Sequence, residues 1–219
     1  MKRYAKTLLR CPLFRGMDEG EILRLLGCLD GRKVIFGKGA ILFHEGDRTA
    51  VFGIVLNGAV QVVQEDYYGN RTIMAHVTGG ELFGESFACA QAEALPVSVA
   101  AVESGAALLL DCRRIIAVCH NACDTHRRLI LNLMQVMAEK NLLLQQKLQV
   151  TSQRTTREKL LAYLDMQARL RGSRRFTIPF RRQELADYLH VDRSGLSTEI
   201  GKLKAEGVID CCRSTFELL

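Results

Sequence analysis

The side chains with the clearest chemical potential lie near the C-terminus, in a polar segment that follows Asp192. The Asp192 carboxylate can accept a hydrogen bond from the first free backbone amides of a helix, so Arg193, Ser194, Ser197 and Thr198 should project from the N-terminal end of that helix. An arginine can donate two hydrogen bonds to a guanine, and hydroxyl groups bond bases or phosphates. We therefore predict contacts with DNA bases here, the alternative being that these side chains are merely solvated.

Apolar residues around this segment fit a helix-turn-helix. Two amphipathic helices are expected over 182–189 and 193–205, with His190 in the turn at a position that often requires a positive φ. The inward-facing residues are Leu185, Ala186, Leu189, Val191, Leu196, Ile200 and Leu203. Basic side chains nearby suit phosphates, which supply affinity without sequence information. The predicted DNA-binding residues are Arg193, Ser194, Ser197, Thr198, Arg182, Gln183 and Lys202, with Arg181 and Lys204 as further candidates for phosphate contact.

A second group of reactive side chains consists of Cys112, Cys119 and Cys123, with His120 and His126 in the same short window. Cys119 and Cys123 are four residues apart, a spacing that places both on one helical face and could serve a metal, a haem or a redox disulfide. Buried cysteine is also a common small core residue. We predict no metal site and no cofactor. The alternative is a redox, metal or haem-based sensor that uses Cys112, Cys119 and Cys123.

Enzymatic motifs are missing from the sequence. There is no nucleophile elbow, no phosphate-binding glycine loop and no metalloprotease helix. His44 and Glu45 are adjacent, but they lie in a strand-turn context that does not resemble a catalytic site. The protein is therefore predicted not to be an enzyme, and the rival class that remains is an interaction module that does not bind DNA.

The N-terminal half must supply a β-rich domain. Short apolar runs separated by glycine occur at 33–36, 40–43, 51–56, 60–63, 72–77, 97–102 and 106–110, and 66–70 has the composition of a hairpin tip. Short strands at this spacing are typical of an antiparallel sandwich or barrel.

Neither proline nor glycine occurs from Cys112 through Arg171, which predicts the longest helical region of the chain. Its apolar residues include Ile130, Leu133, Met137, Leu144 and Leu148. The stripe is wide enough to pair with a second copy of the helix, although packing on its own sandwich is the alternative. A break is expected near 150–156, then a helix over 156–168, an extended segment at 176–179 and a last strand around Phe216.

Composition bounds the class of protein. A chain of 219 residues, 48% hydrophobic and 25% charged, is typical of a soluble protein of two domains. No segment approaches the roughly 18 uninterrupted apolar residues of a membrane helix. With no signal peptide and eight cysteines best interpreted as reduced thiols, we predict a cytoplasmic location. Residues 151–219 carry 13 Lys and Arg against 9 Asp and Glu, which makes this part the better candidate for contact with nucleic acid.

The order of these parts resembles the Crp/Fnr family of bacterial transcription regulators. The resemblance covers 13–219 and is carried by Gly39, Glu45, Gly46, Asp47, Leu56, Asn57, Gly58, Val60, Gly84, Glu85, Arg157, Arg182, Gln183, Glu184, Leu185 and Ala186. It implies an α+β protein with an N-terminal antiparallel β jelly roll of the cyclic-nucleotide-binding type, a long dimerisation helix and a C-terminal winged helix-turn-helix. The expected domains are 1–111 for sensing, 112–150 for dimerisation and transmission, and 151–219 for DNA binding.

The resemblance also implies partners. The expected partners are a second copy of the chain, which forms a homodimer, and double-stranded DNA with a palindromic site. RNA polymerase is a further candidate, and no membrane partner is expected. In the DNA-binding domain, a glutamate and an arginine that several relatives use fall on Ser194 and Thr198, so we expect a different half-site.

Departures from the family concern the effector. Relatives that bind cyclic AMP neutralise its phosphate with an Arg-Ser pair, and those places fall here on Leu95 and Pro96. Their purine-binding pair falls on Leu142 and Leu143. The iron–sulfur cysteine cluster of oxygen-sensing relatives is absent too, since only Cys11 and Cys28 occur near the N-terminus. The predicted effector pocket is Gly84, Glu85, Leu95, Pro96, Leu142 and Leu143, for a small apolar, aromatic or organic-acid effector other than cyclic AMP, the alternative being that the leucines fill it.

Overall fold

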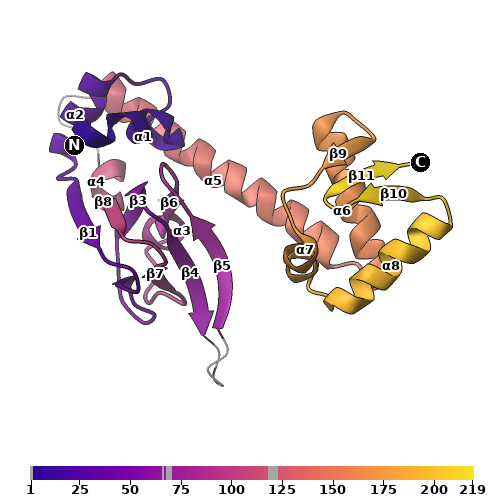
Figure 1. Cartoon of the computed structure of the whole chain (residues 1–219). Helices are drawn as coiled ribbons and strands as arrows, with labels where there is room; N and C mark the ends of the chain where they lie inside the picture. Colours follow the sequence, from indigo (N-terminus) through magenta and orange to yellow (C-terminus); the bar gives the residue numbers. More distant parts are fainter. Residues whose placement is uncertain (1, 66, 68–70, 118–122) are drawn as a thin grey trace. The chain divides into compact units, whose positions relative to one another are not determined.

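The computed structural model describes residues 2–65, 67, 71–117 and 123–219. The chain separates into two compact units, Met1–Ala138 and Glu139–Leu219 (Figure 1). We describe each unit by itself. No helix in the described ranges combines the length and the apolar character needed to cross a membrane.

The first unit begins with short helices. They are η1 (Lys2–Tyr4), α1 (Ala5–Arg10), η2 (Pro12–Phe14) and α2 (Glu19–Cys28). At the start of α2 the Asp18 carboxylate accepts from the Glu21 backbone amide at 2.7 Å, and the Glu21 side chain accepts from the Asp18 amide at 3.0 Å. This capping box satisfies two amides that the first helical turn leaves unpaired.

Two antiparallel sheets follow (Figure 1). One has the order β1 (Arg32–Phe36), β8 (Gly105–Asp111), β3 (Val51–Asn57) and β6 (Leu82–Phe83). The other has the order β2 (Ile41–Phe43), β7 (Ser98–Ala101), β4 (Val60–Glu65) and β5 (Arg71–Val77). The predicted antiparallel jelly roll is confirmed. The sequence analysis did not predict β6 or the helix α3 (Glu85–Cys89), and the expected hairpin tip lies outside the described residues except for Tyr67.

Two apolar clusters hold this unit together. One lies between the sheets and includes Phe36, Val55, Val60 and Val99. The other joins the second faces of β3 and β8 to the N-terminal helices, and Leu129, Leu133 and Val136 extend it. A glycine is required where β3 pairs with β6, since a Cβ on Gly53 would lie 1.9 Å from the Phe83 ring.

The helical region after the jelly roll is divided more than the sequence predicted. Helix α4 (Cys112–Ile116) ends because Ala117 adopts extended backbone angles, φ −62° and ψ 136°. Helix α5 (Asp124–Thr151) begins only at Asp124. The prediction of helix from Cys112 to a first break near 150 is therefore wrong at its N-terminal end, because a sequence without glycine or proline permits a helix but does not require one.

The second unit contains α6 (Thr156–Arg171), β9 (Arg175–Thr177), α7 (Arg182–Leu189), α8 (Arg193–Ala205), β10 (Ile209–Cys212) and β11 (Thr215–Leu218). Its three strands form an antiparallel sheet in the order β10-β11-β9. Helix α6 starts at the predicted break, where Thr155 and Glu158 form a capping box. One buried cluster, centred on Leu160, Leu164 and Leu203, joins all three helices to the sheet. The predicted winged helix-turn-helix is confirmed.

Candidate nucleic-acid interface and sensing domain

The geometry of α7 and α8 follows from a few buried residues. Leu185, Ala186 and Leu189 on α7 are fully buried, as is Leu196 on α8. His190 ends α7 in the left-handed conformation with φ 51°, and the Val191 amide donates to the Ala186 carbonyl at 3.0 Å. This tight turn fixes the direction of α8 and leaves its opposite face exposed.

Asp192 caps α8. Its carboxylate accepts from the Gly195 amide at 2.9 Å and from the Ser194 hydroxyl. The Ser194 hydroxyl, followed by the Gly195 amide, holds the pKa of Asp192 below its ordinary value. The carboxylate therefore stays ionised at neutral pH and matches the positive end of the helix dipole.

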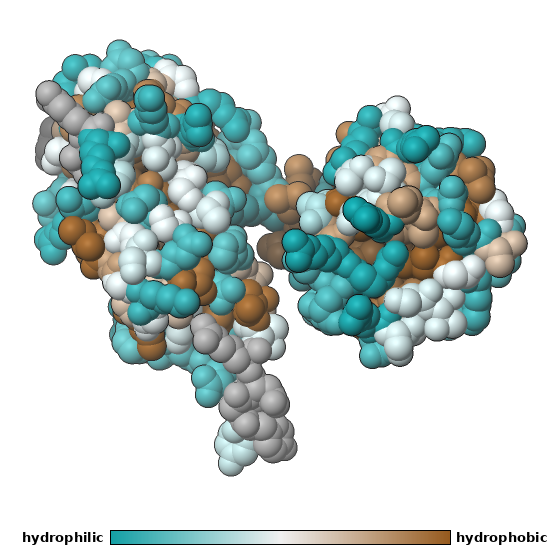
Figure 2. Space-filling model, viewed as in Figure 1, coloured by the Kyte–Doolittle hydropathy of each residue, from teal (hydrophilic) through white to brown (hydrophobic). Residues whose placement is uncertain are grey.

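The outward face of α8 carries the predicted base-contacting residues. Arg193, Ser194, Ser197 and Thr198 are all exposed. The Ser197 hydroxyl donates to the Arg193 carbonyl and the Thr198 hydroxyl donates to the Ser194 carbonyl, each at 3.0 Å. Figure 2 shows a pale band of intermediate hydropathy along α8, as expected of serine, threonine and glycine. Such a surface presents short hydroxyl groups and one long cation to a ligand.

Basic side chains near α8 differ in their engagement. Within the described part of the chain, the Arg193 guanidinium has no ion pair, whereas Lys202 lies 2.6 Å from the Glu199 carboxylate and Lys204 lies 2.7 Å from Asp210. Because a paired cation must leave its partner to meet a phosphate, Arg193 is more readily available to a ligand than Lys202 or Lys204.

Two further predicted residues lie on α7. The Arg182 guanidinium lies 5.7 Å from the centre of the Phe216 ring, a cation–π contact that ties α7 to β11. The exposed Gln183 amide donates to the Asp187 carboxylate at 2.8 Å. Gln183 keeps a carbonyl oxygen and a second N–H for another partner.

Arg157 on α6 connects this helix to the C-terminal end of α8. Its guanidinium forms a two-pronged ion pair with the Glu206 carboxylate at the end of α8, one bond being 3.0 Å long. This pairing lowers the pKa of Glu206. The sequence singled out Arg157 but not Glu206, because 49 residues separate the two and only the tertiary fold brings them together.

Four of the predicted effector-pocket residues belong to the first unit. Gly84 has φ 77° and caps α3, and Glu85 begins that helix with only 3% of its surface exposed. Leu95 is buried and its carbonyl accepts from the Gly46 amide at 2.8 Å, which places it beside the Glu45–Asp47 turn. Pro96 is exposed. Leu142 and Leu143 lie on α5 in the second unit, 58% and 63% exposed.

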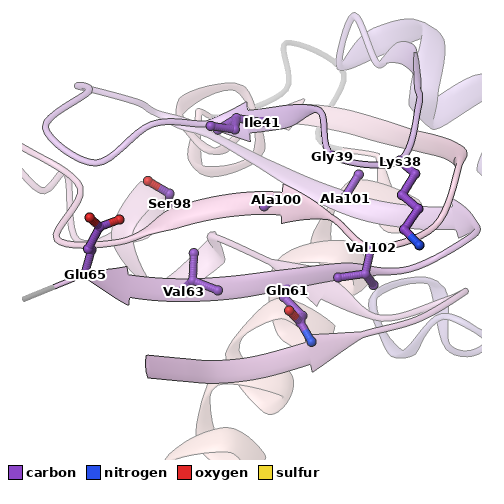
Figure 3. A pocket seen from close by; sticks show the side chains of 10 residues that line it. All are labelled: Lys38, Gly39, Ile41, Gln61, Val63, Glu65, Ser98, Ala100, Ala101 and Val102. Atoms are coloured by element: carbon purple, nitrogen blue, oxygen red, sulfur yellow. The ribbon is translucent and has the colours of Figure 1, made fainter. Parts of the chain in front are cut away.

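A hollow of about 540 Å³ lies over the outer side of the sheet formed by β2, β7 and β4 (Figure 3). Its lining consists of Lys38, Gly39, Ile41, Gln61, Val63, Glu65, Ser98, Ala100, Ala101 and Val102. It includes none of the predicted effector-pocket residues. The sequence analysis missed it, because alternate residues of three strands form its floor and no motif marks them.

The predicted cysteine and histidine window is only partly described. Cys119 and His120 lie outside the described residues, and Cys123 precedes α5 rather than lying within a helix. The buried His126 ring bonds the Ile115 carbonyl through Nε2 at 2.7 Å. Cys112 lies 2.9 Å, sulfur to sulfur, from Cys89, a residue that the sequence analysis did not single out. The described residues hold no cluster of three or more potential metal ligands.

A β-rich sensory domain together with a winged helix-turn-helix defines a DNA-binding transcription regulator. A model described as the cyclic nucleotide-binding domain matches 33–121, and a model described as the Crp-like helix-turn-helix domain matches 158–219. Together the two matches span more than half of the chain. The protein belongs to the Crp/Fnr family of transcription regulators.

Solved structures agree with this fold. The chain is 23% identical to the catabolite activator protein of Thermus thermophilus, with 95% of this chain and 93% of that one covered and a TM-score of 0.51. The c-di-GMP responsive regulator CLP of Xanthomonas campestris is 18% identical, with 92% of this chain and 99% of that one covered and a TM-score of 0.58. A CooA mutant of Carboxydothermus hydrogenoformans is 18% identical, with 90% of each chain covered and a TM-score of 0.57. No curated protein matches the sequence significantly.

Proposed function

We propose that two copies of this chain bind a palindromic DNA site and that α8 of each copy enters the major groove. The observation that carries this proposal is Arg193, exposed at the first turn of the capped α8 and without an ion pair to any described residue. Arg193 contacts a base, and Ser194, Ser197 and Thr198 bond bases or phosphates. The residues proposed for the phosphate backbone are Arg181, Arg182, Lys202 and Lys204, and Gln183 is a further DNA contact. The recognition helices of a dimer would then enter successive major grooves about 34 Å apart.

The dimer is formed through α5. Its exposed apolar side chains include Leu131, Met134, Leu142, Leu144 and Leu148, each more than half exposed in the single chain. Several large exposed apolar side chains on one helix are typical of a subunit interface. On this basis 112–150 acts in dimerisation and transmission, between a sensing domain at 1–111 and a DNA-binding domain at 151–219.

The effector is proposed to be a small apolar, aromatic or organic-acid molecule rather than cyclic AMP. The buried Leu95 and the exposed Pro96 offer no cation for a cyclic phosphate, and an apolar group cannot replace a charge-assisted hydrogen bond to phosphate. Effector binding near Gly84 and Glu85 would shift the population between two arrangements of the DNA-binding domains. The alternative sensor is a metal, haem or redox centre at Cys112, Cys119 and Cys123.

One set of measurements tests these proposals. Duplexes that bind the purified full-length protein are selected from a random library, and their affinity is compared with that of random duplex by fluorescence anisotropy. We expect enrichment of an inverted repeat and a dimeric native mass. Absence of enrichment over random duplex would contradict specific DNA recognition. A visible absorbance band or stoichiometric metal in the purified protein would favour the metal or haem alternative.

A further inference from the structure

Two thiols from separate helices meet in the first unit. Cys89 is the last residue of α3 and Cys112 is the first residue of α4, and these helices contact each other. The two sulfur atoms lie 2.9 Å apart. A disulfide bond is about 2.05 Å long, so the sulfurs must approach by only about 0.9 Å to form one.

The two thiols differ in exposure and in acidity. Cys89 is half-buried, whereas only 1% of Cys112 is exposed. The hydrogen bond between the two thiols lowers the pKa of Cys89, although burial and the nearby Glu85 oppose this effect. The same contact, together with burial, raises the pKa of Cys112. Because Cys89 is the more exposed of the two, it is the sulfur that an oxidant in solvent meets first.

We propose that Cys89 and Cys112 are a reversible oxidation site for hydroperoxides, at which a disulfide joins α3 to α4. The Cys89 thiolate attacks one oxygen of hydrogen peroxide, the O–O bond breaks, and hydroxide leaves as Cys89 becomes a sulfenic acid. The Cys112 sulfur then attacks the Cys89 sulfur, and the sulfenic oxygen leaves as water with the Cys112 proton. The peroxide gains two electrons and the two thiols lose two, and a dithiol reductant reverses the reaction.

The position of this pair connects it to the rest of the first unit. Helix α3 begins at the proposed effector residues Gly84 and Glu85. Helix α4 is bonded to the first turn of α5 through the Ile115 carbonyl and His126. A disulfide would fix α3 to α4 and so restrict the helix that is bonded to the first turn of α5. Resting on the proposed function, this predicts that oxidation changes the affinity for DNA.

Peptide mapping of the full-length protein tests the bond. Trypsin alone leaves both cysteines in the peptide 72–113, because no Lys or Arg lies between Arg71 and Arg113. Trypsin with a glutamate-specific protease separates them into 86–93 and 104–113. After peroxide treatment, alkylation of free thiols and unfolding, we expect these two peptides to be joined, and a dithiol reductant to release them. Recovery of both peptides alkylated after peroxide would overturn the proposal.

Variants identify the order of events. In C112S the Cys89 sulfenic acid has no thiol to resolve it, so we expect dimedone to label Cys89. In C89S we expect no dimedone label at position 89. The matched control is C211S, which removes a half-buried thiol of the second unit and should still form the Cys89–Cys112 link. Faster peroxide oxidation of the exposed Cys28 than of Cys89 would contradict the assignment even if one variant failed to fold.

DNA binding is measured separately on reduced and oxidised wild-type protein. We expect the two forms to differ in affinity for the selected duplex, and C89S to show no response to peroxide. A fully formed disulfide with unchanged affinity would overturn the regulatory part of the inference. In that case the reduced protein would still bind the duplex, so the proposed DNA-binding function would stand.

Discussion

The replacement of Arg193 by alanine gives the most direct test of the interface. Arg193 is exposed at the first turn of α8 and makes no ion pair among the described residues, so its removal should leave the fold intact. A bidentate contact between arginine and guanine contributes about 1–3 kcal/mol to discrimination between bases. A dimer makes this contact twice, so specific binding should lose about 2–6 kcal/mol, roughly 30-fold to 20,000-fold in affinity.

Lys202→Ala is the matched control for Arg193→Ala. Log affinity falls as log salt rises, and each lost phosphate contact makes this negative slope less steep by about 0.9. The two copies in a dimer therefore reduce the steepness by about 1.8. A fourfold rise in salt then reduces the DNA affinity of the variant roughly 12-fold less than that of the wild type. Because a phosphate contact carries no sequence information, the loss should be similar on specific and random duplex.

Fluorescence anisotropy on the selected duplex, on its single-base variants and on random duplex separates these outcomes. For Arg193→Ala we expect the preference for one base pair of each half-site to disappear while binding to random duplex changes little. Equal losses on specific and random duplex would refute the assignment of Arg193 to a base. A circular dichroism melt of the variant confirms that the fold is unchanged.

Three further predictions concern assembly and stability. Leu148→Glu should convert the dimer to a monomer in sedimentation velocity, whereas Leu170→Glu, an equally exposed leucine on α6, should not; a dimeric Leu148→Glu protein would exclude this part of α5 from the interface. Gly105→Ala should lower the free energy of unfolding by about 1–3 kcal/mol, because its Cβ would lie 2.1 Å from a backbone carbonyl of β3. Gly27→Ala, with open space around it on α2, should raise that free energy by up to about 1 kcal/mol, and denaturant titration of both variants tests the contrast. Since the pKa of Asp192 is lowered in the folded protein, its contribution to stability is present above the unfolded pKa of about 3.9 and is lost as pH falls through the lower folded value. The difference in melting temperature between wild type and Asp192→Asn should therefore narrow from pH 5 to pH 3, and a constant difference would count against the cap.

The sequence predicted the second unit most accurately. Helices α7 and α8 begin and end at the predicted residues, His190 has the expected positive φ and Asp192 caps α8 as expected. Each of these features depends on residues within a few positions of one another. Local hydrogen bonds and a 3.6-residue apolar period are properties of the sequence itself, so they can be found without the fold.

Prediction of the first unit was less complete. The seven predicted strands are present, because alternating burial and glycine turns are also local patterns. The short β6 and α3 were missed, since two residues of strand and five of helix are too few to show a period. The end of α4 at Ala117 was missed as well, because nothing in the composition of 112–124 breaks a helix.

The sequence by itself therefore determined the order of the parts, the amphipathic helices and the polar face of α8. Only the tertiary structure decided which distant side chains meet. Arg157 meets Glu206, and Cys89 meets Cys112 although the strands β7 and β8 lie between them in the sequence. The sequence analysis grouped Cys112 with Cys119 and Cys123 because those cysteines are near it in the chain. Its partner in space is 23 residues away, since strand pairing returns the chain to α3. Local spacing is encoded directly in the sequence, whereas such long-range contacts depend on how the packed sheets bring segments together.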